Sequence, residues 1–269
     1  MKKRMAILVV GATGSIGRLV VDEAIRRGHA VRALVRDPGR AGQLARGAQI
    51  VTGDVTRPDT LSAAAEGVDA VVFTLGSDGA GKAGAESIDY GGVRNMLRAL
   101  GGRTGRIALM TAIGVTNRTG AYNRATEAHD WKRRSERLVR ASGLPYTIVR
   151  PGWFDSNGLD EHQLVLLQGD RRQAGDPSDG VVARRQIAEV LVRSLTSDRA
   201  LRKTFELVAV AGPAQNDLEP LFAPLDADPQ GALDGVQDIA NMVLADEPRR
   251  VRDDLDAIHA QHFGNAGAI

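Results

Sequence analysis

Three glycines near the start of the chain, Gly11, Gly14 and Gly17, have the spacing of a phosphate-binding turn. They lie between an apolar run, AILVV, and a segment with helical periodicity. Glycine is needed there because a Cβ would obstruct either the dihedral angles of a tight turn or the approach of a ligand. The first amides of the following helix would face a pyrophosphate at the positive end of the helix dipole; the alternative is a tight turn without a ligand. The predicted pyrophosphate contacts are Gly11, Thr13, Gly14, Ser15, Ile16 and Gly17.

The end of the second predicted strand indicates which dinucleotide binds. A protein specific for NAD normally places a carboxylate there, which accepts hydrogen bonds from the adenosine ribose. This chain places Arg36 first, and a guanidinium matches a phosphate on that ribose. NADP is therefore favoured, with Arg18 as a candidate helper. Asp37 follows directly and keeps NAD open as the alternative.

Residues at the ends of the next two strands extend the predicted cofactor site, because ligands bind at the carboxyl ends of parallel strands. Asp54 is placed to bond an adenine amino group, with Val55 beside it. The alternative role of Asp54 is to cap the turn that begins RPDTLSAA. Thr74, Leu75 and Gly76 are expected along the nicotinamide half of the cofactor.

The order of the predicted elements is that of a parallel sheet with crossover helices. The predicted strands are 6–10, 30–35, 49–52, 70–75, 106–111 and 146–149, and the predicted helices are 16–27, 87–100 and 125–141. Beyond them, LVLLQGDRRQ predicts a hairpin that turns near Gly169 and Asp170, ARRQIAEVLVRSL a helix and KTFELVAV a last strand. The fold class is therefore α/β, a Rossmann-type doubly wound parallel sheet with helices on both faces.

We expect one Rossmann domain over residues 1–213, with the substrate pocket formed partly by 151–183. From residue 214 the chain loses β character, and DLEPLFAPL and EPRRVRDDLDAIHAQHF predict helices. Residues 214–269 are thus expected to be a helical C-terminal extension packed on the same domain. A lid over the substrate and a dimer contact are the alternatives.

Composition excludes several classes of protein. The 35 basic and 33 acidic residues give a net charge of +2, so no nucleic-acid partner is expected. The basic clusters 132–134 and 171–172 lack interleaved aromatic residues and are expected on solvated faces. The chain has no cysteine, which excludes a disulfide framework and a thiolate nucleophile and is compatible with a cytoplasmic protein; no metal site is predicted. The start, MKKRMAILVV, has the charge pattern of a signal peptide but runs directly into the glycine turn, so we expect a first strand and no membrane partner.

Four stretches, GATGSIG, GDVTRPDTL, DAVVFTLGS and GLPYTIVRPGWF, together carry a family resemblance. They resemble the atypical short-chain dehydrogenase/reductase superfamily, in particular its NAD(P)H-binding, NmrA-like and flavin-reductase-like branches. The resemblance covers roughly residues 3–210. It implies that Pro151 and Gly152 contact the cofactor and that the segment after them lines the substrate pocket.

The resemblance also implies a proton-transfer device, and this chain lacks part of it. Members with the full device have a Ser or Thr at the end of the fifth strand, then a Tyr and a Lys one helical turn apart. Thr111 fits the first position and Lys132 best matches the lysine, which puts Ala128 at the tyrosine position. Tyr122 has Thr126, not a lysine, one turn later. Thr111, Lys132 and Tyr122 are therefore the catalytic candidates, with Lys132 also expected to hold the nicotinamide ribose.

Other residues are candidates for the missing proton donor. His129 has an ordinary pKa suited to acid or base work, although a partly exposed helix position is its simpler role. Tyr122 is either a donor folded over the cleft or a loop anchor. Asp155 and His162 lie beyond RPGW, where capping or surface roles are at least as expected as catalysis.

Hydride transfer needs less than proton transfer, namely a dry pocket and an acceptor held against the nicotinamide. Conjugated acceptors such as flavins and quinones take their proton from water or a weak donor. Trp153 and Phe154 fall beside the predicted nicotinamide site and are expected either to stack on a flat substrate or to pack in the core.

The sequence thus favours an NAD(P)H-dependent oxidoreductase that reduces a small conjugated or carbonyl compound. The first alternative is a non-catalytic, NmrA-like redox sensor that binds a protein through its basic helix or its C-terminal segment. The second is an NAD-dependent epimerase or isomerase, against which the missing tyrosine argues. A small-molecule substrate and a monomer or homodimer are expected.

Overall fold

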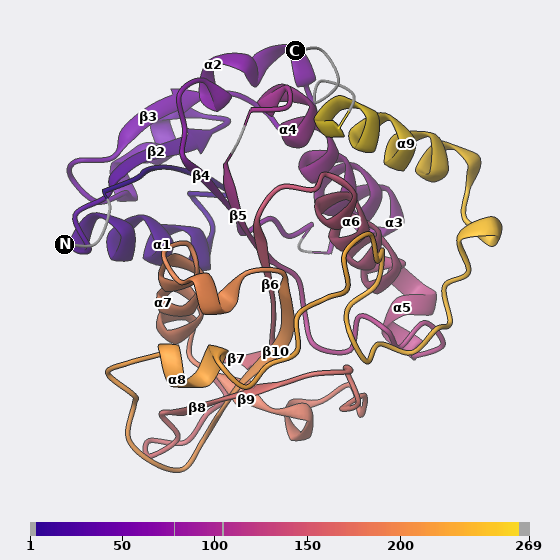
Figure 1. Ribbon diagram of the computed structural model, residues 1–269. Helices are drawn as coiled ribbons and strands as arrows, with labels where there is room; N and C mark the ends of the chain where they lie inside the picture. The colour runs from indigo at the N-terminus through magenta and orange to yellow at the C-terminus, as the bar shows by residue number, and fades with distance from the viewer. Residues whose placement is uncertain (1–3, 78, 104, 264–269) are drawn as a thin grey trace.

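The computed structural model describes residues 4–77, 79–103 and 105–263 (Figure 1). Its sheet has the strand order β3-β2-β1-β4-β5-β6-β10-β9-β7, and β8 pairs with β10 as a branch off this path. The strands are β1 (Ala6–Val10), β2 (Ala30–Val35), β3 (Gln49–Thr52), β4 (Ala70–Phe73), β5 (Arg106–Met110), β6 (Tyr146–Pro151), β7 (Trp153–Phe154), β8 (Gln163–Leu167), β9 (Val181–Val182) and β10 (Lys203–Val210). The strands from β3 to β6, together with β10, form a continuous parallel series.

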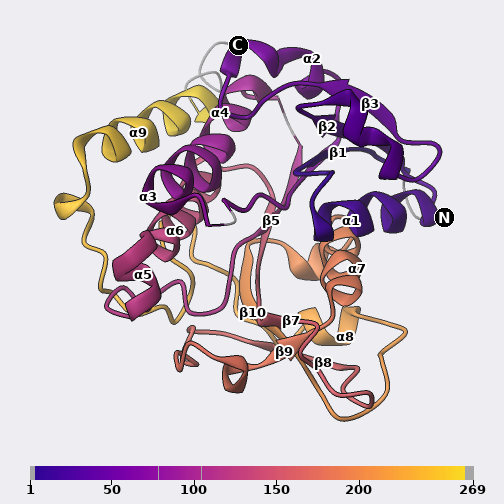
Figure 2. The same cartoon turned by 180° about the vertical axis from the view of Figure 1, so that it is seen from behind.

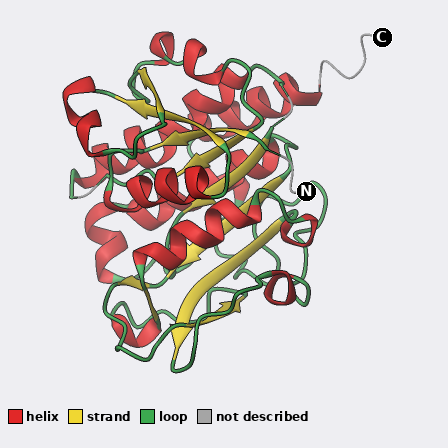
Figure 3. Ribbon diagram, turned by 90° about the vertical axis from the view of Figure 1, so that its left-hand side faces the viewer, coloured by secondary structure: helices red, strands yellow, loops and turns green. Residues whose placement is uncertain are grey.

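Helices cover both faces of this sheet, as Figures 1 and 3 show. The α-helices are α1 (Ser15–Arg26), α2 (Ser62–Ala65), α3 (Gly81–Gly84), α4 (Gly91–Leu100), α5 (Ala121–Thr126), α6 (Ala128–Ala141), α7 (Arg184–Ser194), α8 (Glu219–Phe222) and α9 (Arg249–Phe263), with a π-helical turn, Ala85–Tyr90, directly before α4. Helices α1 and α7 pack together on one face, and α4, α6 and α9 lie on the other (Figures 1 and 2). The predicted Rossmann-type fold is confirmed.

The first strand shows why its sequence is continuously apolar. Ile7 and Val9 are fully buried against the core on the α1 and α7 side, whereas Leu8 and Val10 are fully buried against the core on the α4 and α6 side. Successive side chains of a strand point to opposite faces, so a parallel strand covered on both faces needs apolar residues at every position. In the part of the chain that the structure describes, no helix is both long and apolar enough to cross a bilayer.

The predicted hairpin near Gly169 and Asp170 is wrong in its pairing. Both residues have a positive φ, at 92° and 48°, so the chain does turn there. However, β8 pairs antiparallel with β10 and not with the residues that follow the turn. The reason is that the fully buried Asp170 carboxylate accepts hydrogen bonds from the backbone N–H groups of Gly114 and Thr116, at 2.6 and 2.7 Å. This contact holds the chain after the turn against the loop that follows β5.

The chain between α8 and α9 runs as a strap, residues 226–247, along α6. Helix α9 then packs on α4 and α6. Four arginines of α6 bind the strap: Arg133 donates to Asp234 at 3.1 Å, Arg134 to Glu247 at 2.6 Å, Arg137 to Asp234 at 2.6 Å and Arg140 to Asp228 at 3.0 Å. The expectation that the cluster 132–134 lies on a solvated face is therefore wrong, because Arg133 and Arg134 are buried and paired. The second cluster, 171–172, is exposed as expected.

Asp228 is the most densely bonded residue of the strap. Its Oδ2 accepts from Arg140 Nε, from the Tyr146 hydroxyl at 2.9 Å and from the Thr204 hydroxyl at 2.6 Å, and its Oδ1 accepts from the Val236 amide at 2.8 Å. The carboxylate thus joins α6, β6, β10 and the strap. Because it is buried, it is one of the two carboxylates, with Glu136, that face the buried Arg140.

We expect Asp228→Asn to lower the free energy of unfolding by about 3–5 kcal/mol, because the variant leaves the buried Arg140 without this partner. The exposed Asp226, two residues earlier on the same strap, provides the matched control. Asp226→Asn is expected to change stability by no more than about 0.5 kcal/mol. Urea unfolding of the two variants and the wild type measures both values, and equal losses would contradict the role assigned to Asp228.

Candidate active site at the carboxyl ends of the strands

The glycine turn connects β1 to α1 and has no room for side chains. Gly11 has a φ of +90°, and a Cβ built at Gly17 would lie 2.0 Å from the carbonyl oxygen of Gly11. The turn therefore brings the start of α1 directly against the end of β1. Gly14 is the N-cap of this 12-residue helix, no side chain caps it, and its first turn holds no acidic residue. An uncapped N-terminus of this length attracts an anion, as the predicted pyrophosphate site requires.

A cavity of about 210 Å³ lies beside this turn. Nine of the predicted cofactor residues line it: Gly11, Thr13, Gly14, Arg36, Asp54, Val55, Thr74, Leu75 and Gly76. The predicted residues Ser15, Ile16, Gly17, Lys132, Pro151 and Gly152 are not part of its lining. Five residues that sequence reasoning did not select also line it, namely Leu34, Arg40, Gly53, Thr56 and Ile88.

An adjoining depression of about 360 Å³ concentrates charge at the end of β2. It is lined by Thr13, Arg36, Asp37, Arg40 and Asp54. The Asp37 carboxylate accepts a hydrogen bond from the Gly39 amide at 2.8 Å and so caps the short 3₁₀ turn that follows. Asp37 thus accepts a hydrogen bond from its own loop, and it lines the depression together with Arg36 and Arg40. In the sequence, the one signal for Arg40 as a site residue is that it is a second basic residue after β2. The candidate helper, Arg18, donates to Gln43 instead, at 2.6 Å.

Asp54 takes the capping role that its sequence position suggested, and it also lies in the cavity lining. Its Oδ1 accepts hydrogen bonds from the amide and the hydroxyl of Thr56, at 2.9 and 2.8 Å, so it caps the turn, and it also lines the cavity. Burial alone would raise the pKa of Asp54, but the Thr56 hydrogen bonds and the nearby Arg36 and Arg57 outweigh burial and lower it. A charged acceptor therefore lies in the cavity at neutral pH.

Lys132 is held by a carboxylate from a distant part of the chain. Its Nζ lies 2.8 Å from Oδ1 of Asp89, whose Oδ2 accepts the Ser77 hydroxyl at the same distance. Asp89 is buried within the π-helical turn, next to the cavity residue Ile88. Ser77 follows Gly76, another cavity residue. The ion pair thus ties Lys132 to two segments that adjoin residues of the cavity lining.

Thr111 is also engaged by a carboxylate. Its buried hydroxyl donates to Oε1 of Glu136 at 2.7 Å, one helical turn beyond Lys132. Glu136 is fully buried and accepts from Arg150 Nη2 at 2.7 Å. Burial alone would raise the pKa of Glu136, but the charges of Arg150 and Arg140 and the hydrogen bonds lower it to about 2. Because the hydroxyl proton is directed at this carboxylate, Thr111 has only its lone pairs to offer a ligand.

The tyrosine position of the family device is filled by Ala128, which is buried. The other candidate, Tyr122, is 57% exposed, and its ring lies 5.1 Å from the ring of His129. Burial lowers the pKa of His129, so the imidazole is neutral at pH 7. Its buried Nδ1 has no hydrogen-bond partner within the described residues. The structure thus joins Tyr122 to His129, while Lys132 and Thr111 are each bound to a carboxylate.

The segment after β6 brings aromatic side chains to the surface. Gly152 is packed so tightly that a Cβ would lie 2.4 Å from the carbonyl oxygen of Gly180. Trp153 and Phe154 are 42% and 37% exposed, so they are not core residues. Asp155 accepts from the Arg184 amide at 3.0 Å at the start of α7, which is the capping role, and His162 is exposed. Across the described ranges, no group of three or more His, Asp or Glu residues is placed to hold a metal ion.

Comparisons with known proteins show which family and which structures this chain is similar to. The model of the NAD(P)H-binding family matches residues 11–198. The chain is 30% identical over 207 residues to the photosystem II assembly factor Ycf39 of Synechocystis sp., an alignment that covers 76% of this chain and 62% of that protein. It is 26% identical to sanguinarine reductase of Eschscholzia californica, over 82% of this chain and 96% of the enzyme. A solved structure of a putative NAD-dependent epimerase/dehydratase from Bacillus halodurans is 25% identical and covers 78% of this chain and 96% of its own, with a TM-score of 0.66.

The buried network beneath Thr111 contains one acid that keeps its proton. Oε1 of Glu206 lies 3.3 Å from Arg150 Nη1, and Oε2 of the same side chain accepts a hydrogen bond from the Asp170 amide. Burial, together with the charges of Asp170 and Asp238, raises the pKa of Glu206 to about 8 despite Arg150. The folded protein therefore holds this proton to about pH 8, whereas the unfolded chain releases it near 4.5.

We therefore expect Glu206 to make the wild type progressively less stable as the pH rises from about 5 to 8, by at most about 1.4 kcal/mol per pH unit. Glu206→Gln removes this dependence, so the variant should gain stability relative to the wild type over the same range. Urea unfolding at pH 5.5 and 8, chosen to bracket roughly this window, measures the difference, with the exposed Glu66→Gln as the control. A constant difference between Glu206→Gln and wild type would show that Glu206 does not hold its proton.

Proposed function

The chain belongs to the NAD(P)H-binding family, and from this premise we propose that it is an NADPH-dependent reductase of a small conjugated or carbonyl compound. The observation that carries the proposal is the cavity beside the glycine turn, with Arg36 and Arg40 at its adenosine end. The 26% identity to sanguinarine reductase, over nearly the whole of that enzyme, supports a reductase. Both the substrate class and the choice of NADP are proposed beyond membership of the family.

The residues present fit a dinucleotide. The turn at Gly11 and Gly17 is a cradle that any Cβ would fill, and the uncapped start of α1 would receive the pyrophosphate. Arg36 and Arg40 would hold the phosphate on the adenosine ribose, because a guanidinium forms bidentate hydrogen bonds with phosphate oxygens. The carboxylate of Asp54 would accept a hydrogen bond from the adenine amino group. When bound, reduced nicotinamide supplies the hydride.

Lys132 and Thr111 then act at the nicotinamide end. Lys132 would donate to the ribose hydroxyls and place a positive charge beside the reacting carbons. Asp89 positions the lysine for this task, because it anchors Nζ at 2.8 Å and is itself held by Ser77. Thr111 would accept a hydrogen bond from ribose or substrate, since its own proton is bound to Glu136.

The alanine at position 128, where the family device has a tyrosine, favours a conjugated substrate over a simple ketone. A simple ketone needs a proton on its oxygen as the hydride arrives, and a positioned tyrosine normally supplies it. A conjugated acceptor spreads the charge and can take its proton from water. A flat acceptor of this kind can stack on the exposed rings of Trp153 and Phe154. We therefore favour flavins, quinones and related conjugated compounds over simple ketones.

A non-catalytic redox sensor is the second candidate. Its support is the buried Ala128 at the tyrosine position and the 30% identity to a photosystem II assembly factor. A sensor needs a surface for its protein partner. The basic helix α6 does not provide it, because its arginines are buried under the strap. An exposed part of the strap, where Ile239 and Val243 are 48% and 57% exposed, would have to serve instead.

The choice of cofactor is tested by Arg36→Gln. We expect the dissociation constant for NADPH to rise roughly tenfold to a hundredfold, the cost of about 1.5–3 kcal/mol for a lost charge-assisted hydrogen bond. The constant for NADH should stay the same, because NADH has no phosphate at this position. Isothermal titration calorimetry measures both, with the exposed Arg46→Gln as the control. Equal weakening of NADPH and NADH would refute the assigned role of Arg36.

The reductase itself is tested with a panel of flavins, quinones and simple ketones, by following the absorbance of NADPH. We expect wild-type turnover on conjugated acceptors, and a loss of roughly a hundredfold or more in Lys132→Ala because a positioned charge is removed. The exposed Lys82→Ala is the control. Saturable NADPH binding without turnover on any acceptor would favour the sensor over the reductase.

A further inference from the structure

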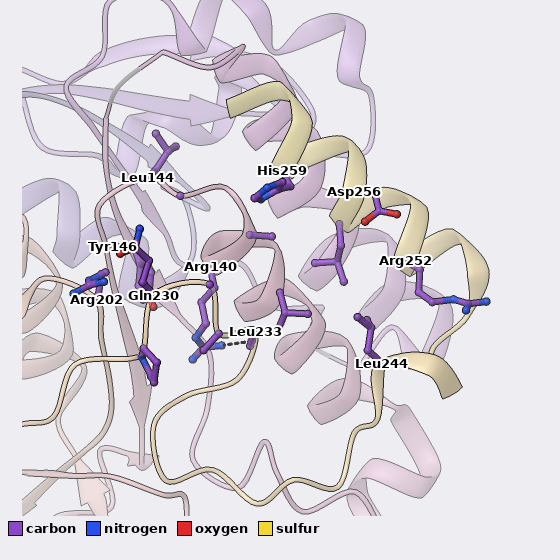
Figure 4. Close-up of a pocket in the computed structure, with 16 residues that line it drawn as sticks. Arg140, Leu144, Tyr146, Arg202, Gln230, Leu233, Leu244, Arg252, Asp256 and His259 are labelled. Atoms are coloured by element: carbon purple, nitrogen blue, oxygen red, sulfur yellow. Dashed lines mark hydrogen bonds between the residues drawn. The ribbon is translucent and has the colours of Figure 1, made fainter. Parts of the chain in front are cut away.

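A second and larger cavity lies at the amino ends of the strands, opposite to the ends that carry the glycine turn. It has a volume of about 670 Å³, within the range of small-molecule sites. Its lining includes residues 143–144 before β6, Tyr146 at the first position of β6, the strap segment 229–233 and one side of α9 (Figure 4). The cavity therefore opens at the amino end of β6, whereas the proposed cofactor lies at the carboxyl ends of the strands. Among the described residues, none lines both this cavity and the one beside the glycine turn.

The walls of this cavity are mostly apolar. Leu144 comes from the loop before β6, Leu233 and Leu244 from the strap and its end, and Leu255 from α9. Leu244 is 41% exposed, although a leucine gains free energy when it is covered. The walls would thus be stabilised by an apolar body that fills the space between α6, the strap and α9.

The charges in the lining favour an anion. Arg202 and Arg252 are exposed, and neither guanidinium has an ion-pair or hydrogen-bond partner within the described residues. Among the described residues, Asp256 is the only acid in the lining. Figure 4 shows Asp256 on α9 beside Arg252, at the far end from Arg202. Arg202 is therefore the guanidinium whose charge no acid in the lining offsets.

The backbone at Arg202 is held in a conformation that arginine rarely adopts. Its φ is 52°, in the left-handed region, which costs a non-glycine residue about 1 kcal/mol or more. Two hydrogen bonds hold it there: the Arg202 amide donates to the Tyr146 carbonyl at 2.8 Å, and its carbonyl accepts from the Asp228 amide at 2.7 Å. The surrounding structure thus fixes the point from which this side chain reaches the cavity. Glycine at this position would have avoided the strain, but it would also have removed the charge.

From the volume, the apolar walls and the unpaired guanidinium, we propose that this cavity binds an amphipathic organic anion, a carboxylate or sulfonate attached to an apolar body. Its acidic group contacts Arg202, and its apolar body lies along Leu144, Leu233 and Leu255. The site is separate from the dinucleotide site and does not require that the protein be a reductase.

The probe for the test is 1-anilinonaphthalene-8-sulfonate, an amphipathic anion whose fluorescence rises in an apolar environment. The folded wild type should bind it saturably, and Arg202→Gln should weaken binding about threefold to tenfold through loss of the charged contact. Arg199→Gln, three residues earlier and outside the lining, is the control and should bind as the wild type does. Circular dichroism confirms that each variant is folded before it is titrated.

Two further measurements distinguish this site from the alternatives. N-phenyl-1-naphthylamine, which lacks the sulfonate, should bind the wild type and Arg202→Gln equally. Saturating NADPH should not displace the anionic probe, whereas dodecanoate should. Displacement by NADPH, or equal affinity of the anionic probe for wild type and Arg202→Gln, would overturn the proposal.

Discussion

The contact between Gly11 and Gly17 is the constraint on which the proposed site depends. The carbonyl oxygen of Gly11 occupies the space that a Cβ of Gly17 would need, so the first turn of α1 lies directly against the end of β1. This approach leaves the N-terminus of α1 uncapped at the mouth of the cavity. The carboxyl ends of β2, β3 and β4 then supply most of the other cavity residues, as expected for a parallel sheet. The close contact of these two glycines thus determines where a site formed by four strands lies.

Helix α6 organises the other half of the molecule through buried charge as well as through apolar packing. On one side Glu136 binds Thr111 and Arg150, and on the other the helix arginines bind the strap. Buried ion pairs add little net stability but are costly to break, because the remaining partner is left as an uncompensated charge. The network therefore specifies where the strap lies on the helix. The same strap forms one wall of the second cavity. By holding the strap, the charged helix therefore also determines the shape of that cavity.

The parts of the structure that could be predicted are those set by local sequence. The strands, the glycine turn and the cavity residues at strand ends follow from patterns only a few residues long. The pairing of Lys132 with Asp89 was missed because 43 residues separate them and no local signal marks Asp89 as a partner. Arg133 and Arg134 were expected in solvent because their carboxylate partners, Asp234 and Glu247, lie 101 and 113 residues away. The hairpin was misplaced because Asp170 is held by amides of a distant loop.

The central claim is that the amides at the start of α1 hold the pyrophosphate of a nicotinamide dinucleotide. Hydrogen exchange of the purified protein, followed by mass spectrometry with and without NADPH, tests it most directly. The account predicts that NADPH slows exchange in the peptide that covers residues 11–18, while peptides from the strap exchange as before. Unchanged exchange in that peptide at saturating NADPH would contradict the account.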